Sequence, residues 1–146
     1  MQFNKDNIKG LAIKQPYADL VVHHGKVETR TWDTQYRGYV LFTASTQPYT
    51  WKTVEMISSS QIISIVSKVN YLSGFRTGVA IGIGKLVSTR LMTKEDEKIA
   101  LVDFQQGLFL HFYEDVTPIH PFKIKGKLGL FTLEESDIEK IQIIHS

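Results

Sequence analysis

Side chains able to bind or transform a polar ligand recur at every second position between residues 26 and 32. They are an ammonium, a carboxylate, a guanidinium and an indole, contributed by Lys26, Glu28, Arg30 and Trp32. In an extended segment these four side chains share one face. The opposite face would then carry Val27, Thr29 and Thr31. The pattern fits a solvated edge strand with a ladder of weak salt bridges, or one wall of a polar cleft.

Polar groups on either side of this segment favour the cleft. Lys14, Gln15 and Tyr17 surround Pro16 and offer an ammonium, an amide that both donates and accepts, and a ring for stacking. Arg37 follows in the next turn, where a guanidinium can hold a phosphate through two hydrogen bonds. We therefore expect a cleft between residues 14 and 37 that suits a planar heterocycle with a phosphate nearby.

A second group of cations lies near the C-terminus. Lys123, Lys125 and Lys127 alternate with other residues, so an extended segment would align them as one basic ridge. The same pattern is typical of an exposed strand that lysines protect from aggregation. Both interpretations stay open at this point.

Metal and thiol chemistry find little support. The chain has no cysteine, which excludes a disulfide framework, a cysteine-rich zinc site and a thiol nucleophile. His23 and His24 are adjacent and cannot share one helix face, while His111 and His120 show no ligand spacing. We expect no metal and no cofactor.

Length and composition predict one domain spanning residues 1–146. A chain of 146 residues with 42% hydrophobic content can bury one core but does not divide comfortably into two. Its net charge of +2 requires that any nucleic-acid contact come from a local patch. No apolar run is long enough to span a bilayer and the start lacks a signal-peptide pattern, so we expect a cytoplasmic protein without membrane contact.

The elements that position these residues follow from periodicity and turn chemistry. Helices are predicted from Pro16 to a stop at Gly25, within 49–69, after a Thr93 cap with Asp96 completing a capping box, and over 134–143. Strands are predicted over 11–13, 27–32, 39–44, 78–87, 108–113, 122–127 and 128–133. Residues 33–38 join two strands as a pair, and Gly82 and Gly84 mark a bulge or a close backbone approach.

This order of elements indicates an α+β domain. Strands that follow one another by turns, with helices inserted at intervals, favour a small curled sheet or barrel with flanking helices. A doubly wound parallel sheet is not indicated. Five aromatic residues are expected in the core rather than in a stacking platform, namely Trp51, Phe104, Phe109, Phe112 and Phe131.

Several segments resemble, in order and spacing, the ASCH (activating-signal-cointegrator homology) domain family. They are LAIKQPYA at 11–18, GKVETRTW at 25–32, YRG at 36–38, Ala44-Ser45, and IKGKLGLF at 124–131. The resemblance covers nearly the whole chain and is weakest over 46–77. It implies a PUA-like fold, which is a small mixed β-barrel with flanking helices, and a cleft that receives RNA or a nucleoside.

The resemblance also implies two possible activities. Most members are regarded as RNA-binding or RNA-modification modules, and some small bacterial ones hydrolyse 4-acetylcytidine with a lysine, a threonine and a glutamate. Here the stretch before Glu28 is one residue shorter, so the family lysine falls on Gly25 and Lys26 stands in for it. Matching Lys26 puts Thr29 at the threonine position, whereas matching Arg30 to the family arginine puts Glu28 there.

From residues and resemblance together, we expect an RNA or nucleotide-type ligand. The predicted ligand-binding residues are Lys14, Gln15, Pro16, Tyr17, Lys26, Glu28, Arg30, Trp32, Arg37, Ser45, Lys125 and Lys127. The alternative is a hydrolase or nuclease acting on a modified nucleoside or RNA, with Lys26, Thr29 and Glu28 as its catalytic group. A protein-interaction module is the third possibility.

Overall fold

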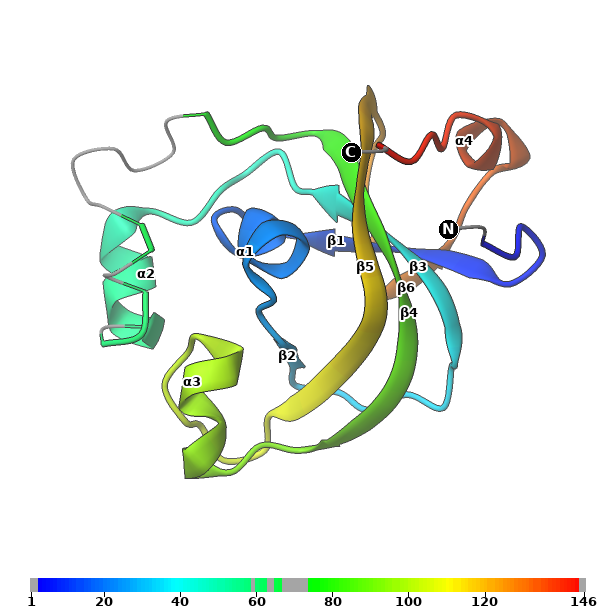
Figure 1. Cartoon of the computed structure of the whole chain (residues 1–146). Helices are drawn as coiled ribbons and strands as arrows, with labels where there is room; N and C mark the ends of the chain where they lie inside the picture. Colours follow the sequence, from blue (N-terminus) through cyan, green and yellow to red (C-terminus); the bar gives the residue numbers. More distant parts are fainter. Residues whose placement is uncertain (1–2, 59, 63–64, 67–73, 145–146) are drawn as a thin grey trace.

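The computed structural model describes residues 3–58, 60–62, 65–66 and 74–144 (Figure 1). Its strands are β1 (Ile8–Ile13), β2 (Glu28–Arg30), β3 (Gly38–Ala44), β4 (Val79–Leu91), β5 (Phe109–Lys123) and β6 (Leu130–Thr132). Its helices are α1 (Tyr17–His24), α2 (Trp51–Ser58), α3 (Glu97–Ala100) and α4 (Glu135–Glu139), with a 3₁₀ turn η1 (Lys94–Asp96) before α3. No helix in these ranges is long and apolar enough to cross a membrane.

The strands form one mixed sheet in the order β2-β5-β4-β3-β1-β6. Only β1 and β3 are parallel; the other neighbours are antiparallel. Figure 1 shows that the long strands β4 and β5 bend strongly, so the sheet curls into a half-barrel. The predicted α+β class, a curled sheet with short helices, is confirmed.

The glycines of β4 allow this curl and the packing inside it. The register between β4 and β5 shifts at three places, and two of the shifts adjoin Gly82 and Gly84. A Cβ on Gly82 would lie 2.7 Å from Val22 Cγ2 of α1. A Cβ on Gly84 would lie 3.1 Å from the Phe42 ring. The predicted bulge is therefore confirmed, and both glycines also leave room for neighbouring side chains.

Helix α1 lies inside the curve of the sheet, where it contacts β3, β4 and β5 (Figure 1). Its apolar residues, including Leu20 and Val21, are buried in the main core. The helix ends at the predicted Gly25, whose φ of 68° is left-handed. The next residue, Lys26, donates its backbone N–H to the Leu20 carbonyl. This turn directs the chain from α1 into β2.

The predicted strand pair over 27–32 and 39–44 is wrong in its pairing. Strand β2 pairs with β5, placing Glu28 opposite His111, whereas β3 pairs with β1 and β4. Residues 31–37 therefore carry the chain from one edge of the sheet to its middle, rather than forming a tight turn. Turn residues predict where a strand ends, but tertiary packing selects its partner.

Other element boundaries also differ from the predictions. Strand β5 is continuous to Lys123, and residues 124–129 form no strand, so the lysines there do not form a strand ridge. Within the predicted 49–69 helix, α2 ends at Ser58, and residues 59, 63–64 and 67–69 lie outside the described residues. Helix α4 covers only five residues. Phe104 is 41% exposed, so its assignment to the core was wrong.

The predicted capping box is confirmed at η1. Asp96 accepts the Thr93 backbone N–H at 2.7 Å, and the reciprocal contact is also present. Both Asp96 oxygens accept hydrogen bonds from the Arg90 guanidinium, at 2.7 and 2.8 Å. These bonds from Arg90 hold the pKa of Asp96 well below its usual range. The box therefore fixes the turn that follows β4.

Gly126 places the 124–129 loop against β1. A Cβ at this position would lie 2.7 Å from the Ala12 Cβ. Gly126→Ala should therefore lower the free energy of unfolding by about 1–3 kcal/mol, because the loop must move off β1. Chemical denaturation measures the change. The neighbouring exposed Lys125 serves as the control, since Lys125→Ala should cost less than about 0.5 kcal/mol; equal losses in the two variants would contradict this packing.

Candidate functional site: a polar cavity at the open edge of the half-barrel

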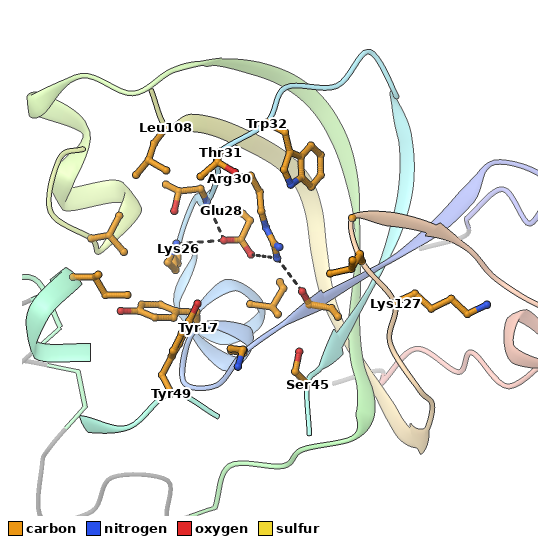
Figure 2. Close-up of a pocket in the computed structure, with 18 residues that line it drawn as sticks. Tyr17, Lys26, Glu28, Arg30, Thr31, Trp32, Ser45, Tyr49, Leu108 and Lys127 are labelled. Atoms are coloured by element: carbon orange, nitrogen blue, oxygen red, sulfur yellow. Dashed lines mark hydrogen bonds and ion pairs between the residues drawn. The ribbon is translucent and has the colours of Figure 1, made fainter. Parts of the chain in front are cut away.

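A cavity of about 420 Å³ opens beside β1, α1 and β2. This volume lies within the usual range for small-molecule sites, roughly 300–1,000 Å³. Figure 2 shows Lys26, Glu28 and Arg30 directed toward one another in the wall of this cavity. The lining comprises Ala12, Ile13, Lys14, Tyr17, Lys26, Glu28, Thr29, Arg30, Thr31, Trp32, Ser45, Tyr49, Ile57, Val102, Leu108, Lys127, Leu128 and Gly129.

The cavity lies where the sheet fails to close into a barrel. Strand β6 pairs only with Lys9 to Leu11 of β1, so the last two residues of β1 extend beyond it. Arg30, from the opposite sheet edge, donates from Nη2 to the Ala12 carbonyl at 3.0 Å. A side chain thus satisfies a carbonyl that a closed barrel would pair with backbone. Arg30 joins the two edges and lines the space between them.

Three ionisable side chains form a chain along the cavity wall. Glu28 Oε1 lies 3.7 Å from Lys26 Nζ, and Glu28 Oε2 lies 3.5 Å from Arg30 Nη2 (Figure 2). The Lys26 and Glu28 side chains are only 1% and 5% exposed, against 22% for Arg30. Glu28 also accepts the Thr29 backbone N–H at 2.9 Å. The carboxylate is therefore the centre of a buried Lys26–Glu28–Arg30 cluster.

Burial and the attraction between opposite charges have opposite effects on the pKa values of Glu28 and Lys26. Burial would raise the pKa of Glu28, but Arg30, Lys26 and the Thr29 N–H outweigh it and lower that pKa, so the carboxylate stays ionised. Burial lowers the pKa of Lys26, and Glu28 offsets only part of this effect. The cavity wall therefore contains a fixed anion beside an amine that loses its proton more readily than a solvated lysine.

Aromatic rings form the rest of the polar wall. Lys26 Nζ lies 5.4 Å from the centre of the Tyr17 ring, and Lys14 Nζ lies 5.3 Å from that of Tyr49. The rings of Tyr17 and Tyr49 meet edge to face at 5.7 Å. Trp32 adds an indole on the β2 side. Two lysine ammonium groups thus lie over two adjoining tyrosine rings in this wall.

His111 of β5 contacts both the backbone and the side chain of Trp32. It is fully buried in β5, and its Nε2 lies 3.0 Å from the Trp32 carbonyl, so that nitrogen carries the proton and donates. Its ring meets the indole edge to face at 5.0 Å. Burial lowers the pKa of His111, which keeps the imidazole neutral. The sequence does not indicate this contact, because the pairing of β2 with β5 is not visible in it.

Most of the predicted site residues meet at this cavity. Those that line it are Lys14, Tyr17, Lys26, Glu28, Thr29, Arg30, Trp32, Ser45 and Lys127. Figure 2 shows the Lys127 side chain pointing away from the Lys26–Glu28–Arg30 cluster, so only its base adjoins the cavity. The prediction of separate faces is wrong for Thr29 and Thr31, which also line the cavity. Thr29 is the middle residue of the three-residue β2, and Thr31 follows the end of that strand.

Four predicted residues do not line the cavity. Gln15 is fully buried, and its side-chain amide bonds Asp19 and the Arg76 carbonyl. Pro16 precedes α1. Arg37 donates to the carbonyls of residues 34 and 36 and to the Thr89 hydroxyl. Lys125 is exposed outside the lining.

The far wall of the cavity is not predicted by the sequence motifs. Tyr49, Ile57, Val102 and Leu108 come from segments distant from the motif. The aromatic Tyr49 could have been suspected as a stacking ring, but apolar residues such as Ile57 carry no signal that separates a cavity wall from a core.

No metal centre is evident in the part of the chain that the structure describes, where no three His, Cys, Asp or Glu side chains gather. Comparison of the sequence with protein-family models gives no match. A search of curated proteins likewise gives no significant match.

Proposed function

We propose that the cavity binds a nucleotide base, free or as part of RNA. The observation that carries the proposal is the buried Lys26–Glu28–Arg30 cluster in the wall of an open, base-sized cavity. A nucleobase presents ring carbonyls and amino groups at its edge and π faces above and below. Cations and a fixed carboxylate meet such an edge, while Trp32 and Tyr49 offer rings for the faces.

The charge of the cavity favours a ligand with a phosphate. Its lining carries three basic side chains whose charged ends adjoin the cavity, from Lys14, Lys26 and Arg30, against the single carboxylate of Glu28. Among the described residues the Lys14 ammonium contacts only the Tyr49 ring, so it remains available at the cavity. A nucleotide therefore fits this site better than an uncharged heterocycle of the same size.

Membership of the ASCH family, and with it a PUA-like fold, is part of this proposal. It is supported by the motif resemblance and by the curled α+β sheet. The same motif segments at 11–18 and 25–32 supply most of the polar cavity wall.

Titration calorimetry at low salt with the four ribonucleoside 5′-monophosphates tests the proposal. At least one should bind saturably, and Trp32→Ala should weaken that binding by about 1–3 kcal/mol through loss of stacking. Phe104→Ala removes an exposed aromatic outside the cavity and should leave the affinity unchanged. If none of the four binds, the nucleotide site is refuted and a protein-interaction module becomes the better explanation.

Hydrolysis of a modified nucleoside is the second candidate, favoured by the lowered pKa of Lys26 and by Thr29 in the same cavity. A neutral Lys26 amine could accept a proton from the threonine or from water as either attacks an amide carbonyl. Glu28 stays ionised and would hold Lys26 in place. Mass spectrometry of a 4-acetylcytidine incubation should then show cytidine and acetate, and Lys26→Met should abolish both. Absence of cytidine with the unaltered protein would reject this candidate.

A further inference from the structure

We propose that the cavity takes its base from a stacked RNA strand, and that Leu128 fills the place the base leaves. This inference rests on the proposed nucleotide function and goes further by naming a polymer as the ligand. The observation behind it is the position of Leu128, an almost fully exposed leucine that borders the cavity.

The Leu128 side chain is more exposed than any other large hydrophobic side chain among the described residues. Its exposure is 98%, well above the 72% of Met56, the next of the exposed large hydrophobic residues among those described. Single exposed leucines are common on protein surfaces and need no explanation by themselves. Leu128 differs because it lies at the mouth of a base-sized polar cavity. An apolar side chain held in water there is ready to enter a gap in a stacked strand that lies across the mouth.

The backbone on both sides holds Leu128 in this position. Gly126 packs closely on Ala12, since a Cβ added to this glycine would lie 2.7 Å from the Ala12 Cβ. Gly129 adopts a left-handed φ of 62° and leads directly into β6, whose Leu130 pairs with Leu11. The loop is thus attached to β1 before and after Leu128, and the side chain is presented outward.

Cations beside Leu128 suit a phosphate backbone. Lys125 and Lys127 are both exposed, and Figure 2 shows Lys127 directed away from the cavity. A mononucleotide in the cavity would not reach ammonium groups that point outward. In an RNA strand, the phosphates of the neighbouring nucleotides would reach these ammonium groups.

The cavity and Leu128 have complementary roles in this proposal. Moving a base out of a stack costs a few kcal/mol, and an apolar side chain that enters the gap recovers part of that cost. A free mononucleotide leaves no gap, so Leu128 should matter only for the polymer. This difference separates the inference from the proposed function itself.

The test uses an RNA hairpin whose stem contains the mononucleotide bound best in the calorimetric titration, with 2-aminopurine as its 3′ neighbour. Binding should raise 2-aminopurine emission, because the neighbouring base leaves the stack. Leu128→Ser should weaken hairpin binding about tenfold or more while the mononucleotide affinity stays the same. Lys125→Ala should reduce the salt dependence of hairpin binding without affecting the mononucleotide.

The outcomes distinguish the two proposals. If the mononucleotide binds but Leu128→Ser leaves hairpin affinity and emission unchanged, the wedge is refuted and the nucleotide site stands. Hairpin binding without increased emission refutes the wedge as well. If no mononucleotide binds, both proposals fall, because the inference rests on the nucleotide site.

Discussion

Glu28→Gln is expected to lower the free energy of unfolding by about 3–5 kcal/mol, the range for breaking a buried ion pair by removing one partner. Glu28 is 5% exposed and lies between Lys26, at 3.7 Å, and Arg30, at 3.5 Å. The amide of glutamine keeps the size of the side chain but removes the charge. Lys26 would then be buried without an anion, and its pKa should fall further. Chemical denaturation at neutral pH measures the loss.

The pH dependence gives an independent readout of the same cluster. The pKa of Glu28 in the folded protein lies below its ordinary 4.5, so ionised Glu28 stabilises the fold above that pH. This contribution is lost as the pH falls through the lowered folded-state pKa. The unaltered protein should therefore lose stability in acid through this group, and Glu28→Gln should lack that part of the loss.

An exposed ion pair supplies the matched control. Lys140 Nζ lies 3.9 Å from Asp137 Oδ1, and the Lys140 side chain is 54% exposed. Lys140→Ala should cost less than about 1 kcal/mol, because solvent screens such pairs. Similar losses for Glu28→Gln and Lys140→Ala would show that the Lys26–Glu28–Arg30 cluster contributes no more to stability than a surface pair.

Arg30→Ala is expected to weaken nucleotide binding by roughly 10- to 100-fold, the equivalent of losing a hydrogen bond from a charged group. Nη2 of Arg30 is already engaged by Ala12 and Glu28. Nη1 has no hydrogen-bond partner among the described residues, and the side chain is 22% exposed at the cavity. The free edge of the guanidinium is therefore available to a phosphate or a ring carbonyl.

Arg37 offers a control of the same residue type. We expected it to hold phosphate, but its guanidinium bonds groups of its own loop and Thr89, outside the cavity. Arg37→Ala should therefore leave the affinity within about twofold of the unaltered protein. Calorimetry compares the two variants below their unfolding temperatures, after circular dichroism confirms that both are folded. A larger loss for Arg37→Ala than for Arg30→Ala would mean that the ligand binds elsewhere.

Local signals explain the parts of the fold that the sequence predicted. The Gly25 stop, the Thr93 capping box and the Gly82 bulge each depend on a few neighbouring residues, and all three are present. Strand pairing is not local. The pairing of β2 with β5 joins Glu28 to His111 across more than 80 positions, and no turn residue between them encodes it.

In the candidate site, too, the residues that local spacing predicts differ from those that depend on contacts between distant segments. The spacing of Lys26, Glu28 and Arg30 was enough to place them in one cluster, because a short extended segment aligns them. The spacing could not show that Gln15 is fully used by its own neighbours, nor that Tyr49 completes the wall. Both depend on how distant segments pack, which alternation along one strand does not determine.

The most direct test of the central claim, that a nucleotide occupies this cavity, is an amide and indole chemical-shift titration by nuclear magnetic resonance. The chain has two tryptophans, one lining the cavity and one outside its lining, Trp32 and Trp51. The best-binding mononucleotide should shift the Trp32 indole and the amides of Thr29 and Arg30, and should leave the Trp51 indole in place. Saturable shifts at residues outside the cavity, with an unchanged Trp32 indole, would contradict the account.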